Sequence, residues 1–263
     1  PIQYTRNALV RNAILISLAA LGALVLLVWL QLYVWKDTSD LAYRITRVVP
    51  LSVSKIDGQP VRYSDYLLYH RSTINVLQGQ SMSDATASDR MSFQQEQALE
   101  RALEDAYAKK LADERGIIIA SEQVDKLIEQ QRNDSGLTEG AYTAVVNDHL
   151  RWTMEELRQA VHNTLLRQEV AFSVDTEASG LAQRVGDMIS QEQSLASIHQ
   201  ELGQVIELQQ DIVVPKDNSD GGLSLAAANL DINQTSGAIK DIAGGDGYYF
   251  ITRHSSEDDA IRY

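Results

Sequence analysis

The longest uninterrupted hydrophobic segment of the chain lies close to its N-terminus. Residues 13–34 read AILISLAALGALVLLVWLQLYV, and no charged residue occurs between Arg11 and Lys36. A helix rises about 1.5 Å per residue, so a segment of this length reaches across roughly 30 Å, the hydrocarbon thickness of a bilayer. The pattern therefore predicts a transmembrane helix over residues 13–36, preceded by a short tail over residues 1–12.

The ends of this helix carry residues that are typical of a membrane interface. They are Arg11, Trp29, Tyr33, Trp35 and Lys36. Aromatic and basic side chains are enriched where lipid headgroups meet water. A buried core helix would be shorter and more polar on one face, and a cleaved signal peptide would have a shorter apolar stretch ending at small residues. The pattern thus favours an uncleaved anchor over both alternatives.

A short polar neck over residues 37–47 follows, as a continuation of the helix or as a linker. Beyond it, Val49, Leu51 and Val53 alternate with polar neighbours up to the pair Asp57 and Gly58. Alternation that ends in Asp-Gly is typical of a strand entering a tight hairpin turn.

Residues 63–172 then show helical periodicity, interrupted by polar breaks. The pattern predicts five short helices: from Tyr63, through residues 99–111, from Ser121, after Thr138, and from residue 153. The segment GQSMSDATASD (79–89) is expected to be a loop, Gly116 a helix C-cap, and TMEE (153–156) a capping box. Residues 48–172 are therefore expected to form an all-α module behind a small hairpin.

The composition changes after this module, and residues 173–263 are expected to form a small α+β domain. Helices are predicted over residues 177–191 and 195–202, strands over 204–215 and 247–254, and a loop over 216–222. Here the apolar spacing changes from helical to alternating, the pattern of a strand.

Charge and cysteine content exclude several classes of function. The chain has a net charge of −13, and residues 51–263 alone carry −16. An acidic body repels nucleic acid, so no nucleic-acid partner is expected. The chain has no cysteine, which excludes disulfides and thiolate catalysis. The acidic turn at Asp217 and Asp220 lacks the spacing of a calcium loop, so neither a metal nor a cofactor is expected.

Basic residues on both sides of the apolar helix leave its orientation undecided by charge. Arg6 and Arg11 precede the helix, whereas Lys36, Arg44 and Arg47 follow it. A short tail before a first helix usually stays in the cytoplasm. The prediction is a single-pass protein of the cell membrane with a cytoplasmic N-terminus and an extracytoplasmic body.

Three segments of the body, in this order, resemble a known family. They read IDGQPVRYSDY, KKLADERGIIIASEQVDKLI and LTEGAYTAVVNDHLRWTMEELRQAVHNTLLRQEV. Their order is similar to that of the SurA N-terminal chaperone domain, which is also found in membrane-anchored foldases of the PpiD and PrsA kind. The resemblance covers residues 48–170. The matching positions are Asp57, Gly58, Tyr66, Lys110, Gly116, Ser121, Val124, Tyr142, Trp152 and Leu157.

Residues 173–263 resemble a degenerate parvulin-type peptidyl-prolyl isomerase domain. SDGGLS (219–224) is similar to the Gly-Gly-x-Leu loop of that family, and GDGYYFITRH (245–254) to its last strand. The resemblance implies a histidine in that strand, where this chain has Tyr249. It implies another in the first strand, which would fall in RQEVAFSV (167–174) and has none. An inactive isomerase fold without catalytic residues is therefore expected.

Aromatic residues of the helical module are the candidates for binding unfolded polypeptides. They are Tyr66, Tyr69, Phe93, Tyr107, Tyr142, Trp152 and Phe172. Most lie at core spacings, where packing is the default role, but a chaperone would use some of them to line a cradle for apolar segments.

The resemblance implies a membrane-tethered extracytoplasmic chaperone that binds unfolded secreted or membrane polypeptides near the translocon. Its partners would be those clients, the bilayer, and a translocon or another membrane complex. Two alternatives stay open. One is an active peptidyl-prolyl isomerase with substituted histidines, and the other is an accessory subunit of a membrane complex that reuses this fold for docking.

Overall fold

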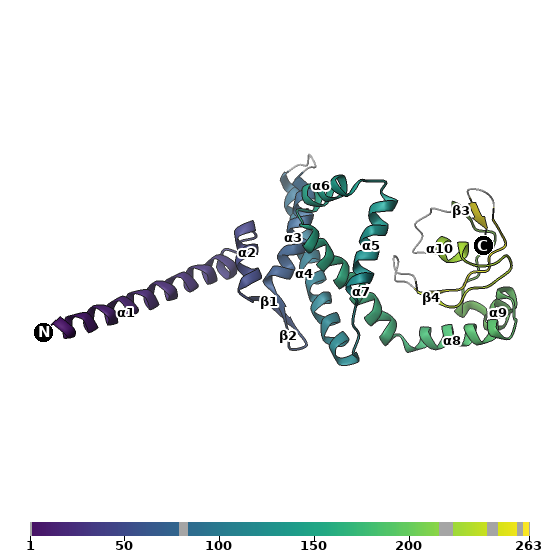
Figure 1. Cartoon of the computed structure of the whole chain (residues 1–263), viewed down its shortest axis with the longest axis horizontal. Helices are drawn as coiled ribbons and strands as arrows, with labels where there is room; N and C mark the ends of the chain where they lie inside the picture. Colours follow the sequence, from purple (N-terminus) through teal and green to yellow (C-terminus); the bar gives the residue numbers. More distant parts are fainter. Residues whose placement is uncertain (1, 79–83, 216–222, 241–246, 257–259, 263) are drawn as a thin grey trace. The chain divides into compact units, whose positions relative to one another are not determined.

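The structure is a computed structural model of the chain and describes residues 2–78, 84–215, 223–240, 247–256 and 260–262 (Figure 1). The chain divides into two compact units. One comprises Pro1–Leu103 and His149–Arg151, and the other comprises Glu104–Asp148 and Trp152–Tyr263.

The apolar segment is helical throughout. Helix α1 (Ile2–Trp29) continues into a short π-helix, η1 (Leu30–Val34). The stretch Leu9–Val34 is long and apolar enough to cross a membrane, and none of its most apolar window is buried. The predicted neck is neither a continuation nor a linker. It contains a separate helix, α2 (Asp40–Val48), whose N-cap Ser39 accepts a hydrogen bond from the Ala42 amide at 3.3 Å.

The predicted hairpin is confirmed. Strands β1 (Ser52–Ile56) and β2 (Gln59–Arg62) pair antiparallel, and Ile56 pairs with Gln59. Asp57 and Gly58 between them have φ angles of +47° and +80°. Two successive positive φ values match the right-handed twist of a hairpin, which explains the Asp-Gly pair.

Five helices follow, as predicted. Their bounds are α3 (Tyr63–Gln78), α4 (Asp84–Arg115), α5 (Ser121–Asp134), α6 (Glu139–Leu150) and α7 (Met154–Val174). The loop predicted over 79–89 is wrong for residues 84–89, which begin α4; residues 79–83 lie outside the described residues. Residues 84–89 lack an apolar periodicity, but they also lack glycine and proline, so nothing in their sequence stops a helix.

The predicted helix ends are confirmed. Gly116 has a φ of +67°, and the Ile117 amide donates to the Ala112 carbonyl at 2.9 Å, which closes α4 with a left-handed cap. At the start of α7, Thr153 Oγ1 accepts from the Glu156 amide at 3.2 Å, and Glu156 Oε2 accepts from the Thr153 amide at 2.8 Å.

A buried polar cluster joins α4 to α7. Asp105 is 1% exposed, accepts a hydrogen bond from Asn163 Nδ2 at 2.7 Å and forms an ion pair with Arg167. Helix α5 packs against α7, and Ile128 and Leu165 are among the buried apolar side chains of these helices. The cluster thus satisfies a charge inside an apolar helical core.

The remaining residues form a smaller α+β part. Its helices are α8 (Thr176–Ser190), α9 (Leu195–Leu202), the short 3₁₀ turn η2 (Gly203–Val205) and α10 (Leu223–Ala228). Its strands are β3 (Val213–Pro215), β4 (Ile239–Lys240), β5 (Tyr248–Tyr249), β6 (Ser255–Ser256) and β7 (Ala260–Arg262). They pair in the order β3-β7-β6 and as the separate pair β4-β5.

Helices α8 and α9 appear where they were predicted, but the strands are shorter than expected. Only 213–215 of the predicted strand 204–215 is a strand, and only 248–249 of the predicted strand 247–254. The segment RQEVAFSV is not a strand but the C-terminal end of α7. Leu166 and Val170 are both buried there, so the helical periodicity continues and overrides the strand preference of Val and Phe. Asp175 then caps α8.

Two further predictions concern the segment SDGGLS and the loop over 216–222. Leu223 and Ser224 of that segment begin α10, and residues 216–222 lie outside the described residues.

Candidate functional site

The C-terminal end of the apolar helix packs against the hairpin and α3. Leu32, in η1, is only 2% exposed. The Tyr33 hydroxyl donates to the Ser52 carbonyl at 2.7 Å, and the Tyr63 hydroxyl donates to the Leu32 carbonyl at 3.3 Å. The rings of Tyr33 and Tyr63 also meet edge to face, with centroids 6.3 Å apart. The apolar helix is therefore joined to the hairpin and to α3 by side chains as well as by the backbone.

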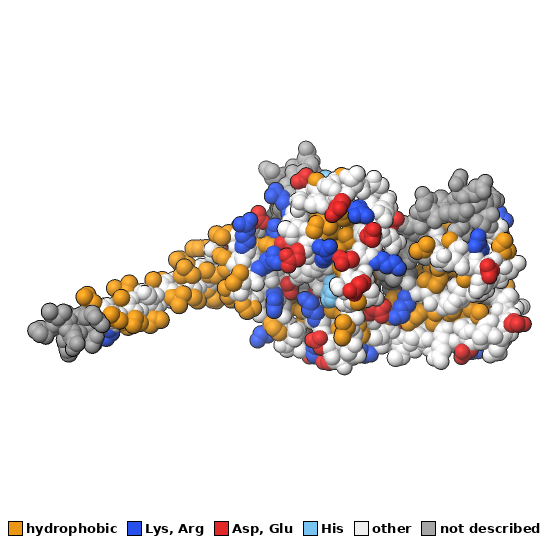
Figure 2. Space-filling view, in the orientation of Figure 1, with side chains coloured by type: hydrophobic (Ala, Val, Ile, Leu, Met, Phe, Trp, Pro, Cys, Tyr) orange, Lys and Arg blue, Asp and Glu red, His pale blue; other side chains and the backbone are white. Residues whose placement is uncertain are grey.

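The predicted interfacial residues around this junction are exposed. Trp35 is 67% exposed and Trp29 is 50% exposed, while Lys36, two residues after the end of η1, has a φ of +49°. Figure 2 shows hydrophobic side chains along α1 and basic side chains where the helix meets the body. Arg11 lies within α1, about five turns before Trp29.

Asp37 holds the chain just after the junction. Its carboxylate accepts hydrogen bonds from the Gln31 amide group, the Ser39 main-chain amide and the Ser39 hydroxyl. Burial alone would raise the pKa of Asp37, but these donors favour the ionised form and bring its pKa below the ordinary value. A charged Asp37 therefore stabilises the corner between η1 and α2.

The seven aromatic candidates divide between the two units. Tyr66, Tyr69 and Phe93 lie in one unit, and Tyr107, Tyr142, Trp152 and Phe172 lie in the other. Phe93 and Tyr107, both on α4, are exposed by 56% and 40%. Only these two large rings among the seven are exposed enough to offer an apolar surface.

The other candidates are engaged in packing. Tyr66 lies between Tyr63 and His70, with ring centroids 5.8 and 5.3 Å away, and burial, with a smaller contribution from Tyr63, raises its pKa to about 12. Trp152 is buried. The hydroxyl of the half-buried Tyr142 reaches Gln131 at 3.5 Å.

Phe172 meets Tyr248 edge to face at 5.1 Å, and the Lys240 ammonium lies 5.2 Å from its ring centroid. Lys240 also pairs with Glu169 at 2.9 Å. Phe172 thus joins the end of α7 to the strands β4 and β5. Tyr69 is half-buried.

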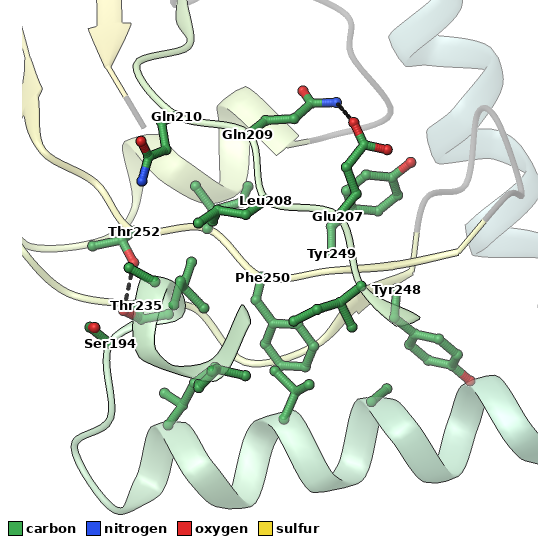
Figure 3. A pocket seen from close by; sticks show the side chains of 18 of the residues that line it. Ser194, Glu207, Leu208, Gln209, Gln210, Thr235, Tyr248, Tyr249, Phe250 and Thr252 are labelled. Atoms are coloured by element: carbon green, nitrogen blue, oxygen red, sulfur yellow. Dashed lines mark hydrogen bonds between the residues drawn. The ribbon is translucent and has the colours of Figure 1, made fainter. Parts of the chain in front are cut away.

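One concave surface among the described residues was not predicted from the sequence. It is a cleft of about 1220 Å³ within residues 178–254, between α8, α9, the segment 205–212 and the segment 247–254, which contains β5 (Figure 3). Most of its lining is apolar. The apolar residues include Leu181, Val185, Ile189, Leu195, Ile198, Ile206, Leu208, Ile212 and Phe250.

Polar groups lie along the edge of this cleft. Gln209 Nε2 donates to Glu207 Oε1 at 3.0 Å, and the hydroxyls of Thr235 and Thr252 share a hydrogen bond of 2.8 Å (Figure 3). Among the described residues, the main chain of residues 207–212 makes no hydrogen bond to another backbone group. The cleft therefore offers an apolar lining next to a segment whose peptide groups make no backbone hydrogen bond within the described part of the chain.

Tyr249, at the predicted degenerate position, lies in β5 opposite Ile239 and also borders the cleft. The alternation of Ile206, Leu208, Ile212 and Val214 was the available sequence signal for this site. Such alternation predicts a strand, whereas most of the segment is irregular and presents these side chains to the cleft.

Comparison with known proteins gives one match. The sequence model of the SurA-like N-terminal domain family matches residues 3–171, which include the apolar helix, the hairpin and helices α3 to α6 with most of α7. The match ends before α8 and the cleft. Neither the curated proteins nor the solved structures contain a significant match to this chain.

Proposed function

Because this chain belongs to the family of SurA-like N-terminal domains, we propose that it is a membrane-tethered extracytoplasmic chaperone that binds unfolded polypeptides. In this proposal α1 is the tether, and the clients are secreted or membrane polypeptides that emerge near a translocon. The observation that carries the proposal is the open apolar cleft of about 1220 Å³ in a chain whose N-terminal helix can span a bilayer.

The junction supports an anchor that is retained rather than cleaved. A signal peptide leaves the mature protein, so its end has no reason to form part of the folded body. Here removal of η1 would leave the Tyr63 hydroxyl without its acceptor on Leu32 and would uncover the surface on which Leu32 is buried. The proposed topology has a cytoplasmic N-terminus and an extracytoplasmic body.

The cleft fits an unfolded chain better than a small ligand. Pockets for small molecules usually measure about 300 to 1,000 Å³ and enclose most of their ligand. This cleft is larger, and its lining offers many apolar side chains with few polar groups in fixed positions. Such a surface can bind apolar segments of many sequences, because burial of apolar area needs no directional match.

The peptide groups of residues 207–212, which make no backbone hydrogen bond within the described part of the chain, suggest how a client binds. An extended polypeptide can add hydrogen bonds to an open backbone segment, while its alternate side chains enter an apolar cleft. Leu208 and Phe250 would contact those side chains (Figure 3). Backbone pairing is independent of sequence, as a chaperone with many clients requires.

Tethering makes weak binding sufficient. Confinement beside a membrane exit site raises the effective concentration of the cleft around emerging chains without any new contact. Weak contacts also let a client leave and fold. Phe93 and Tyr107 offer further exposed rings on α4 for such contacts.

The isomerase alternative gains little from the structure. The segment that would supply its first strand is the end of helix α7, and Tyr249 stands where the resemblance implies a histidine. The accessory-subunit alternative has no observation in its favour among the described residues. Both therefore rank below the chaperone proposal.

An aggregation assay tests the proposal. The full chain in detergent micelles is mixed with a chemically denatured model client, and light scattering is followed after dilution. Wild type is expected to suppress aggregation. Leu208→Asp, which places a carboxylate in the cleft, is expected to weaken client binding about tenfold or more, because it removes the burial of a leucine.

Leu225→Asp is the matched control, because Leu225 is 59% exposed on α10 and does not line the cleft. This variant is expected to behave like wild type. If the wild-type chain does not suppress aggregation, the proposal is contradicted. If both variants lose the same amount of suppression, the cleft is not the client-binding surface.

A further inference from the structure

Helix α2 exposes apolar side chains on the face opposite to the one that it buries. Its buried face consists of Ala42, Tyr43 and Thr46, which pack toward α3. On the other side, Leu41 is 59% exposed and Val48 is 83% exposed. A short helix packed against its own body by one face has no folding reason to show two large apolar residues to water.

A basic residue lies between the two exposed apolar side chains. Leu41, Arg44 and Val48 are three and four residues apart and therefore share one face of α2. Arg44 is exposed, and no ion pair or hydrogen bond of its side chain occurs within the described residues. Leu41 and Val48 can enter the headgroup region of a bilayer, and the long side chain of Arg44 beside them can extend its guanidinium to the lipid phosphates.

The charge around α2 is opposite to that of the rest of the body. Residues 35–62 contain five Lys or Arg against three Asp, a net charge of +2. Residues 1–34 add +2, so residues 63–263 must carry −17 for the chain to total −13. An anionic surface would therefore attract this segment and repel most of the remaining body.

The position of α2 is set by the junction with the apolar helix. Only five residues separate Val34, the end of η1, from Asp40 at the start of α2. Asp40 pairs with Arg71 Nε at 2.8 Å, and the Arg71 guanidinium lies over the Tyr43 ring, 4.3 Å from its centroid. These contacts hold α2 on α3, so its exposed face keeps a fixed direction relative to the apolar helix.

We propose that the face of α2 formed by Leu41, Arg44 and Val48 lies on the bilayer and binds the headgroups of anionic phospholipids. This inference rests on the proposed membrane anchor, because it requires α1 to span the same bilayer. With α1 across the bilayer and α2 on its surface, both the tilt and the rotation of the unit that contains both helices are fixed relative to the membrane. The hairpin and α3, which belong to the same unit as α2, are then held in one orientation above the membrane.

Single-cysteine labelling of the full chain in lipid bilayers tests this inference. The chain has no cysteine, so Leu41→Cys and Val48→Cys each provide one site for a nitroxide label. Accessibility to oxygen, which concentrates in lipid, is compared with accessibility to a water-soluble nickel complex. Both labels are expected to be in lipid when the bilayer contains phosphatidylglycerol. Glu96→Cys, at an exposed position of α4 in the same unit, is the control and is expected to stay in water.

The lipid dependence is tested by charge reversal. Near an anionic surface one arginine changes surface affinity about fivefold, so Arg44→Glu is expected to lower the docked population by more than that factor. Arg90→Glu makes the same change of charge at an exposed position of α4 and is expected to leave the docked population of α2 unaltered.

Alkaline extraction separates the two proposals. If the wild-type chain is extracted from the bilayer, the anchor itself is wrong. If the chain stays inserted while both α2 labels remain in water, or if pure phosphatidylcholine gives the same docking as phosphatidylglycerol, the inference is wrong and the anchor stands.

Discussion

The contact of α4 with α7 and the packing of α8 and α9 around the cleft bury apolar residues in contrasting ways. Between α4 and α7 even a charged residue is enclosed, since Asp105 is 1% exposed and has both Asn163 and Arg167 as partners. Around the cleft, Val185, Met188 and Ile198 form a small core, but neighbouring apolar side chains line an open space of about 1220 Å³. The comparison indicates a closed scaffold and a surface available for binding.

The largest loss of stability is expected from a substitution in the closed region between α4 and α7. Asp105→Ala removes a buried carboxylate and leaves Arg167 without its main partner, so unfolding is expected to become easier by about 3 to 5 kcal/mol. Chemical denaturation followed by circular dichroism measures this. Arg158→Ala is the control, because its pair with Asp125 at 2.8 Å is exposed, and a loss below about 1 kcal/mol is expected. Equal losses would show that Asp105 is not enclosed as described.

A second pair of substitutions compares the space available in the two regions. Ala112, on α4, is 2% exposed and does not border the cleft, whereas Ala182, on α8, is buried but lines it. Ala112→Leu is expected to destabilise the fold by about 1 to 3 kcal/mol through overpacking. Ala182→Leu is expected to change stability much less, because the cleft can hold the larger side chain. The midpoints of urea denaturation of the two variants measure these losses. An equal loss of stability in both variants would mean that the cleft closes in solution.

A third prediction concerns a buried polar group that lacks partners. His70, on α3, is 1% exposed, and neither ring nitrogen has a hydrogen-bond partner among the described residues. Burial lowers the pKa of His70, so the unfolded chain binds a proton that the folded chain does not when the pH falls below about 6.5. Stability should therefore fall on acidification, by at most about 1.4 kcal/mol per pH unit. Denaturation at pH 7.5 and 5.5 measures it, and His70→Leu should show a smaller decrease.

The smallest difference in stability is expected between variants of the N-caps of α7 and α9. Thr153 forms a reciprocal capping box with Glu156, whereas Ser194 only accepts from the Ser197 amide at 3.2 Å and contacts the Ser197 hydroxyl. Thr153→Ala is expected to lower stability by about 1 kcal/mol and Ser194→Ala by about half as much. Thermal unfolding of both variants checks the order, and a larger loss for Ser194→Ala would contradict the contrast.

The sequence predicted the helical region well because its signals there are local. The Asp57-Gly58 turn, the cap at Gly116 and the capping box at Thr153 each act within a few residues, and each appears where it was expected. The beginning of α4 was missed, since residues 84–89 carry polar side chains that favour a loop by composition alone.

The cleft region was harder to predict because its structure depends on contacts that are distant in the sequence. Ile206 and Leu208 alternate as in a strand, but no partner strand pairs with them among the described residues, so the alternation produces an apolar lining instead. RQEVAFSV has strand-forming residues, yet it continues the buried face of α7. The distribution of the seven aromatic residues between packing and exposure likewise follows from tertiary contacts, as the ring contacts of Tyr66 and Phe172 illustrate.

Site-specific photocrosslinking in membranes tests the central claim most directly. The full chain is reconstituted in liposomes with a benzophenone amino acid in place of Leu208 or, as the control, in place of exposed Leu225, and irradiated with a denatured or a folded client. The account predicts a crosslink from position 208 to the denatured client only, and none above background from position 225. Equal crosslinking from both positions, or crosslinking of the folded client at position 208, would contradict a cleft that binds unfolded chains.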